Sequence, residues 1–498
     1  MAWFRRGAAA ESGSAMDNIG WLYEYGQGVP QSYAKAMAWY RKGAAAGSGW
    51  AMNSIGVLYY NGLGVPRDYA KAMAWFRKAA AAGSGPAAFG VGLLYENGLG
   101  VPQDYTKAMA WFREGAAAGS GAAMFGVGWL YEYGLGVPRN YAKAMAWYRE
   151  GAAAGGGRAM NSIGVLYANG QGVPQSYAKA MAWYRKGAAA GCGLAMSNIG
   201  SLYFSGSGVL RSYAKAMAWY RKGAAAGSGS AMSNIGWLYE HGLGVPQDYA
   251  RTMAWFRKGA AAGSGLAAFG VGCLYYNGLG VLRSYAKAMA WFRKAAAAGN
   301  GTAMAKIGQL YEFGLGVPQD FAKAFAWFRE AAAAGNGTAM AKIGQLYEYG
   351  LGVPQDSAKA MAWLRRGAAA GSGSAMYYIG RLYEFGSFDL AKAMAWYRKG
   401  AAAGNALAMK NVGRFYQHGL GVPQDFTKAM AWYRKGAAAG SGMATYYIGR
   451  LYENGLGVPQ DYAKAIKWLK RAEKHGGVAA ALAAKAIKKI RAAESGGQ

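Results

Sequence analysis

The chain has 498 residues, and its 55 Lys and Arg against 23 Asp and Glu give a formal net charge of +32. Two cysteines are too few for a disulfide framework, and the three histidines are too far apart for metal-ligand spacing. No apolar run is long enough to span a bilayer, and no signal peptide is visible.

Residues 1–14 read as half of a repeating unit. The segment "MAWFRRGAAA" at 1–10 aligns with a later segment that begins at Met37, so we expect a second helix without its first. Trp3 and Phe4 then pack on one side only. Because the chain starts inside a repeat, the compartment stays open: cytoplasmic as written, unless an upstream segment carries a signal peptide.

Tryptophans mark a fixed internal period. They lie 36 residues apart from Trp39 to Trp363, and after one interval of 33 the spacing of 36 resumes from Trp396 to Trp468. This gives thirteen copies, numbered here from 1 to 13, and we expect them to form one domain over residues 15–475.

Each copy predicts two helices. In repeat 1, Met16, Ile19, Leu22 and Tyr23 make one apolar stripe along residues 15–26, and "YAKAMAWYRKGAAAG" at 33–47 has a similar stripe. The intervening "GQGVPQS" contains glycines and a proline, which end helices. A connection this short makes the two helices antiparallel neighbours.

The residue before each second helix is always one that caps a helix N-terminus, because its side-chain oxygen accepts a free backbone N–H. In chain order these residues are Ser32, Asp68, Asp104, Asn140, Ser176, Ser212, Asp248, Ser284, Asp320, Asp356, Asp389, Asp425 and Asp461.

A glycine lies inside every first helix, as at Gly20, Gly56, Gly92 and Gly128. Glycine costs a helix about 1 kcal/mol relative to alanine, so we expect a packing reason, namely close approach of neighbouring backbones. The "GAAAG" that ends the second helices supplies a further small-residue surface.

The recurring pattern A-x-x-x-I-G-x-L-Y-x-x-G-x-G-V-P-x-D-Y-x-K-A-x-x-W-Y-R-K-A-A-x-x-G resembles the Sel1-like repeat, a relative of the tetratricopeptide repeat with a longer unit. The resemblance implies an all-α fold, a right-handed α-solenoid of antiparallel helix pairs. It also implies a non-catalytic adaptor without a cofactor, which holds a protein or peptide partner on a concave surface lined by the first helices.

Second helices hardly vary among the copies, whereas the first helices vary at three positions, numbered −3, +1 and +5 from the internal glycine. Positions four apart share one helix face, so we predict that this face binds the partner. The predicted binding residues are Trp21, Tyr25, Trp129, Tyr133, Trp237, His241, Gln309, Gln345, Tyr377, Arg381, Arg414 and Arg450. The alternative is that position +1 packs against the next repeat and has drifted.

The last three repeats carry arginine at +1, and arginine binds carboxylates bidentately. We therefore expect a partner segment that is apolar toward the early repeats and acidic toward Arg381, Arg414 and Arg450. We expect a monomer and no small-molecule substrate.

The net charge supports a rival function. Cations recur on the second helices, as at Lys35, Arg41 and Lys42, and a regular cationic exterior attracts nucleic acid or an anionic membrane surface. The alternative is a solvated face that keeps an alanine-rich protein soluble, and no nucleic-acid motif accompanies the charge.

An enzyme is not predicted. Acidic residues recur in the first helices, as at Glu24, Glu96, Glu132, Glu240 and Glu312, and we expect them to pair with basic residues. "GLGVP" lacks the Gly-Lys-Ser/Thr of a phosphate loop, so it reads as a turn.

Two late segments depart from the pattern. Repeat 11 has "GSFD" at 386–389 in place of "GLGVPQD", which either changes the local curvature or is harmless. Residues 476–498 predict a C-terminal capping helix with Leu482, Ala483, Ile487 and Ile490 on one face. A membrane-surface role for this helix is the weaker alternative because it has few large apolar residues.

Overall fold

The computed structural model describes residues 2–9 and 12–495, and within these ranges the regular elements are α-helices without a strand. No helix of the described part is both long and apolar enough to cross a membrane. The helices gather into two compact units, Met1–Ala262 and Gly263–Gln498, and each is described by itself.

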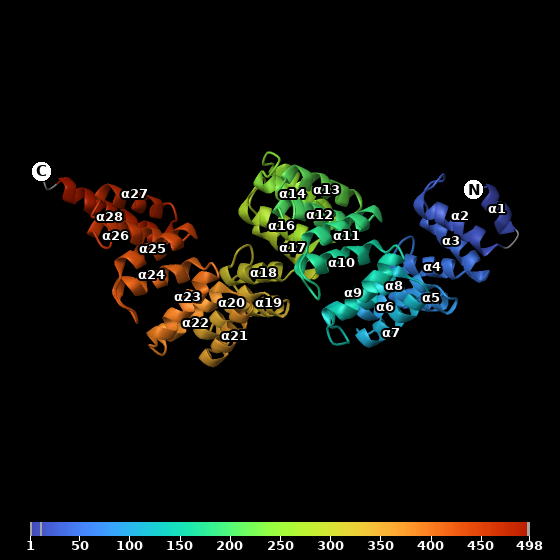
Figure 1. Ribbon diagram of the computed structural model, residues 1–498, viewed down its shortest axis with the longest axis horizontal. Helices are drawn as coiled ribbons and strands as arrows, with labels where there is room; N and C mark the ends of the chain where they lie inside the picture. The colour runs from blue at the N-terminus through green and yellow to red at the C-terminus, as the bar shows by residue number, and fades with distance from the viewer. Residues whose placement is uncertain (1, 10–11, 496–498) are drawn as a thin grey trace. The chain divides into compact units, whose positions relative to one another are not determined.

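The helix bounds follow the period of the sequence, and Figure 1 labels the helices. The first unit contains α1 (Ala2–Ala9), α2 (Gly13–Tyr25), α3 (Tyr33–Ala45), α4 (Gly49–Asn61), α5 (Tyr69–Ala81), α6 (Gly85–Asn97), α7 (Tyr105–Ala117), α8 (Gly121–Tyr133), α9 (Tyr141–Ala153), α10 (Gly157–Asn169), α11 (Tyr177–Ala189), α12 (Gly193–Ser205), α13 (Tyr213–Ala225), α14 (Gly229–His241) and α15 (Tyr249–Ala261). The second contains α16 (Gly265–Asn277), α17 (Tyr285–Ala297), α18 (Gly301–Phe313), α19 (Phe321–Ala333), α20 (Gly337–Tyr349), α21 (Ser357–Ala369), α22 (Gly373–Phe385), α23 (Leu390–Ala402), α24 (Ala406–His418), α25 (Phe426–Ala438), α26 (Gly442–Asn454), α27 (Tyr462–Glu473) and α28 (Gly477–Ser495).

Every repeat contributes one even-numbered first helix and one odd-numbered second helix, which pack against each other as an antiparallel pair. The second helix also packs against the first helix of the next repeat, so the pairs form a continuous α-solenoid within each unit. The predicted all-α repeat fold is therefore confirmed.

All thirteen predicted N-caps are present. Each of these side chains accepts a hydrogen bond from the backbone N–H three residues later, as Asp104 does from Lys107 at 2.9 Å. Asp389 does so from the shortened turn of repeat 11, where Phe388 has a φ of 50°. The cap thus survives the loss of three residues.

The internal glycines lie against a side chain from the second helix of the same repeat. A Cβ placed on Gly92 would lie 2.3 Å from Cε1 of Phe112, and one on Gly20 would lie 2.3 Å from Cε1 of Tyr40. The same arrangement recurs in all thirteen repeats, with Leu364 and Leu469 replacing the ring in repeats 10 and 13. The expected packing reason is present, but the close contact is made by a side chain and not by a second backbone.

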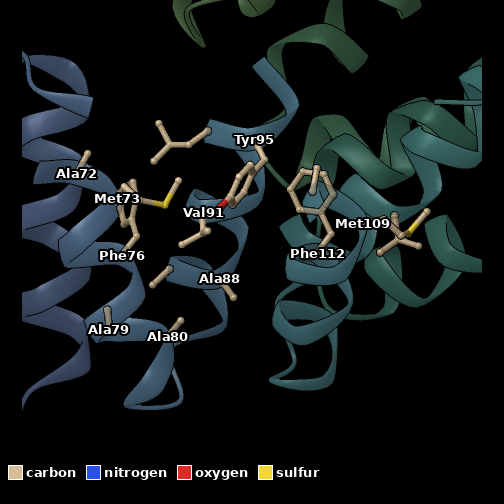
Figure 2. Close-up of a cluster of buried hydrophobic side chains, with 14 of the residues drawn as sticks. Ala72, Met73, Phe76, Ala79, Ala80, Ala88, Val91, Tyr95, Met109 and Phe112 are labelled. Carbon is tan, nitrogen blue, oxygen red and sulfur yellow. The ribbon is translucent and has the colours of Figure 1, made fainter. Parts of the chain in front are cut away.

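Small residues also bring successive repeats together. A Cβ on Gly115 of α7 would lie 2.8 Å from the Gly85 carbonyl oxygen of α6 and 2.8 Å from the Ala123 Cβ of α8. Figure 2 shows the result, a buried layer in which Phe76, Val91 and Phe112 lie between the helices.

The two ends of the array differ. In α1, Trp3 is 82% exposed and Phe4 is 37% exposed, while residues 1, 10 and 11 lie outside the described residues. In α28, Ala483, Ile487 and Ile490 are buried against the preceding helices, as the apolar pattern predicted, whereas Leu482 of the same predicted face is half-buried. Residues 496–498 lie outside the described part.

We predict that Gly92→Ala destabilises the protein by about 1–3 kcal/mol, because the added methyl group collides with the ring of Phe112. Helix propensity alone predicts the opposite sign, a gain of about 1 kcal/mol. The matched control Ala110→Gly, at an exposed site in α7, should cost about 1 kcal/mol by propensity alone. Urea unfolding followed by circular dichroism measures both, and a stabilised Gly92→Ala protein would refute the packing argument.

Candidate partner-binding face

The first helices lie on the inner side of the repeats. In the first unit each one touches the first helix of the next repeat, as α6 touches α8 and α10 touches α12. Successive second helices of the described part make no contact of comparable extent. The repeats of the first unit therefore converge on the side of the first helices, the side expected to be concave.

Burial differs among the three variable positions. Position −3 is buried or half-buried throughout, position +1 is half-buried or marginally exposed, and position +5 is exposed in all thirteen repeats. Side chains at the variable positions thus become more exposed toward the C-terminal end of each first helix. Only positions +1 and +5 offer surface that a partner could contact.

Aromatic side chains at +1 and +5 of the first unit lie against each other. The ring centroids are 5.3 Å apart for Trp21 and Tyr25, and 5.1 Å apart for Trp129 and Tyr133. The rings of Trp237 and His241 are stacked at 4.0 Å, and Trp237 remains 38% exposed. Positions four apart therefore do meet on one face, as the helical spacing predicted.

A shallow pocket of about 220 Å³ lies beside Trp237 and is lined also by Phe204, Tyr220 and Asn234. Phe204 meets the Trp237 ring edge-on at a centroid distance of 5.2 Å. Sequence comparison overlooked Phe204, which stands at +4, where most other repeats have an acidic residue.

Four of the eight glutamates at +4 have a side-chain hydrogen-bond partner inside their own repeat among the described residues. Glu24 accepts one from the Tyr40 hydroxyl at 2.5 Å, and Glu384 one from the Tyr397 hydroxyl at 2.7 Å. Glu312 instead pairs with Lys342 of the next repeat at 2.9 Å. The expectation of basic partners holds for Glu312. Glu24 and Glu132 instead accept a hydrogen bond from a tyrosine hydroxyl, a pairing visible in the sequence only as Glu and Tyr sixteen residues apart.

Glu96 has no such donor, because Phe112 stands where other repeats have tyrosine. Burial raises the pKa of Glu96 to about 7. Burial also raises the pKa of Glu240, whose repeat carries Phe256 at the same place.

The uncharged residues predicted to bind the partner in the second unit are Gln309, Gln345 and Tyr377, and their surroundings differ from one another. Gln309 accepts a hydrogen bond from the Lys306 ammonium at 3.1 Å, and Gln345 lines a pocket between α20 and α22. Tyr377 is nearly buried and packs against Tyr397, with ring centroids 5.9 Å apart. Tyr377 therefore supports the face from beneath and does not offer it a contact surface.

Two of the three arginines at +1 have internal partners. Arg414 forms an ion pair with the buried Glu384, and Arg450 pairs with Glu453 of its own helix at 3.1 Å. Arg381 has no carboxylate partner among the described residues, and its Nη1 donates to the Tyr349 hydroxyl at 2.9 Å. The argument that these arginines need an external partner therefore applies only to Arg381.

Lys410, at −3 in repeat 12, is a charged residue that the sequence analysis did not select. Burial, and next the nearby Arg414, lower its pKa to about 8. The described residues contain no group of His, Cys, Asp and Glu that could hold a metal ion.

The repeat itself identifies the family. The family model described as the Sel1 repeat matches thirteen segments between residues 13 and 477, from 13–48 to 442–477. The chain belongs to the Sel1 repeat family. This family is one of non-catalytic repeat scaffolds.

Solved structures of Sel1 repeat proteins are similar to this chain. A protective antigen of uropathogenic Escherichia coli with an SLR fold is 32% identical over 84% of this chain and 90% of that chain, with a TM-score of 0.46. A Sel1 repeat protein from Oxalobacter formigenes is 32% identical over 62% of this chain and 90% of that chain, with a TM-score of 0.42. Among curated proteins, none matches the chain significantly.

The exterior of the Sel1 repeats carries most of the positive charge in a regular arrangement. Lys42 lies 4.6 Å from the centre of the Trp39 ring, and Lys186 lies 4.4 Å from that of Trp183. Arg77 of α5 donates to the hydroxyl of Tyr95 in the next repeat at 2.8 Å. Many cations therefore help to pack the repeats, while Lys42 and Lys186 themselves stay exposed.

The buried Glu96 predicts a pH dependence of stability. Its pKa is higher in the folded than in the unfolded chain, so the stability it contributes is present below pH 4.5 and is lost as pH rises toward 7. Glu96→Gln should raise the free energy of unfolding by about 2 kcal/mol at pH 8 and change it little at pH 4. Denaturant unfolding at both pH values checks this, with the exposed Glu114→Gln as control; an equal effect at both would refute it.

Proposed function

We propose that this Sel1 repeat protein is a non-catalytic scaffold that binds a segment of a partner protein along the first-helix face. The observation that carries the proposal is the exposure of the paired aromatic side chains at +1 and +5. Tyr25 is 56% exposed and Tyr133 58% exposed, although both rings pack against a tryptophan in a tilted arrangement.

Exposed tryptophan and tyrosine rings are effective binding anchors, since each buries a large area on binding and orders few torsions. Contact with the +1 partner also fixes the +5 ring before a ligand arrives, which lowers the entropy cost of binding. The second helices, in contrast, repeat nearly the same residues along the chain and offer no distinct address to a partner.

The structure narrows the kind of partner segment expected. Aromatic pairs in repeats 1, 4 and 7 favour an apolar stretch in the first unit. Of the arginines at +1, Arg381 has no internal carboxylate partner, so an acidic residue of the partner is proposed to lie there and not at Arg414 or Arg450.

The test replaces the residues at +1 and +5 of repeat 7 by those that other repeats of the same chain carry at these positions. Repeats 2 and 5 carry Val and Asn at +1 and +5, as at Val57 and Asn61, so Trp237→Val with His241→Asn should keep the fold. We predict that this double variant weakens partner binding about thirtyfold, because the stacked pair of Trp237 and His241, taken as one anchor, contributes about 2 kcal/mol. Titration of the partner, isolated on the wild-type chain, measures the change.

The control tests the rival basic exterior. Lys186→Gln with Lys222→Gln removes two exposed cations from second helices without touching the first-helix face. Unchanged partner affinity in this control, together with loss in the repeat 7 variant, supports the scaffold. Loss in the control alone, with affinity that falls steeply as salt is added, would favour a nucleic-acid or membrane-surface function.

A further inference from the structure

Repeats 10 and 11 of the second unit enclose a pocket that the array does not fill. It has a volume of about 150 Å³ and lies between α20, α21 and α22, with Gly344, Leu364 and Phe385 among its lining residues. We call it the repeat-10 pocket.

Two departures from the repeat pattern lie at this pocket, Leu364 and the turn that begins at Gly386. Leu364 replaces the tyrosine or phenylalanine that packs on the internal glycine in most repeats, and it is shorter than either. The turn at 386–389 lacks the leucine and valine that pack against the core elsewhere, as Leu63 and Val65 do. The pocket therefore results from substitutions at one seam.

The pocket contains a carboxylate that lacks a hydrogen-bond donor. Glu348 lines it, and the Oε2 atom of Glu348 is buried without a partner. In repeat 4 the equivalent Glu132 accepts a hydrogen bond from the Tyr148 hydroxyl at 2.5 Å, as Glu24 does from Tyr40. Leu364 occupies the place of that tyrosine and has no hydroxyl, so repeat 10 keeps the acceptor and has lost the donor.

Repeat 13 shows that a leucine at this position does not by itself leave the glutamate at +4 without a hydrogen-bond donor. It has Leu469 at the equivalent position, but Arg450 pairs with its Glu453, and α28 packs over its first helix. In repeat 10 the corresponding residue at +1 is the neutral Gln345. Glu96 and Glu240 also lack a tyrosine donor, but the rings of Phe112 and Phe256 pack on the internal glycine of their repeats. Repeat 10 differs in that the unpartnered carboxylate lines a pocket.

The charged residues that line the pocket disfavour a charged ligand. The Arg381 guanidinium lies beside the pocket, 6.0 Å from the ring centre of Tyr378 and 5.8 Å from that of Phe385, so it repels a cation. Glu348 repels an anion. A neutral aromatic ring with a hydroxyl donor meets both demands, because aromatic walls surround the ring and Glu348 accepts a hydrogen bond from the hydroxyl.

We infer that the repeat-10 pocket binds the tyrosine side chain of a partner segment, in place of the internal tyrosine that repeat 10 lacks. A volume of about 150 Å³ is that of a cavity known to admit a benzene ring. The inference rests on the proposed scaffold function, since it names one residue that the bound segment supplies.

The test uses the full chain and p-cresol, which is the tyrosine side chain alone, with toluene as the analogue that lacks the hydroxyl. Ligand-observed NMR titration should give an affinity for p-cresol about tenfold higher than for toluene, the effect of a hydrogen bond to a charged acceptor. Glu348→Ala, which copies Ala168 of repeat 5, should bring the two affinities together. Leu364→Tyr should abolish p-cresol binding by restoring the internal ring.

The Leu364→Tyr variant is expected to fold, because six repeats carry tyrosine at this position, and its unfolding midpoint checks this. Absence of p-cresol binding to the wild type, equal affinity for toluene, or unchanged binding to a folded Leu364→Tyr protein would each overturn the inference. No partner is needed in this experiment. Its failure would therefore leave the repeat 7 test standing, and failure of that test would leave the pocket result standing.

Discussion

The contact between a second-helix side chain and the internal glycine of the first helix determines most of what this array conserves. Because a ring such as Phe112 occupies the space of a Cβ on Gly92, neither residue can change without repacking the pair. The same ring lies under the next repeat as well, where Gly126 approaches it. The second helices and the glycines are therefore nearly constant, and variation is confined to positions that leave the core.

The residues at those positions differ in part because the glutamate at +4 of the same or a neighbouring repeat needs a hydrogen-bond or ion-pair partner. A glutamate at +4 is stabilised where a tyrosine hydroxyl, a lysine or an arginine reaches it, whereas burial without such a donor raises the pKa of Glu96. Arg414 serves Glu384 in this way and is therefore part of the structure. The residues left over for a partner are those without such an internal role: the exposed rings at +5, Trp237, and Arg381.

Much of the fold follows from local sequence signals. The period, the helix pair, the thirteen N-caps and the apolar face of α28 each depend on residues close together in the chain, so their spacing alone predicts them. Contacts between side chains of neighbouring repeats cannot be predicted in this way, because the residues involved lie far apart in the sequence. Nothing near Arg414 in the sequence indicates Glu384, thirty residues earlier, and Tyr377 was assigned to the surface because its depth depends on the neighbouring helices. The repeat-10 pocket could be predicted only by knowing that Leu364 and the shortened turn lie next to the same space.

The central claim is that a partner lies on the first helices and not on the second. Site-specific photo-crosslinking tests it most directly, with a benzophenone amino acid at His241 of α14 or at Ala218 of α13, both of them exposed. In the producing cell, the account predicts a discrete cross-linked adduct from position 241 and none from position 218. Adducts of equal yield from both positions, or an adduct from position 218 alone, would contradict it.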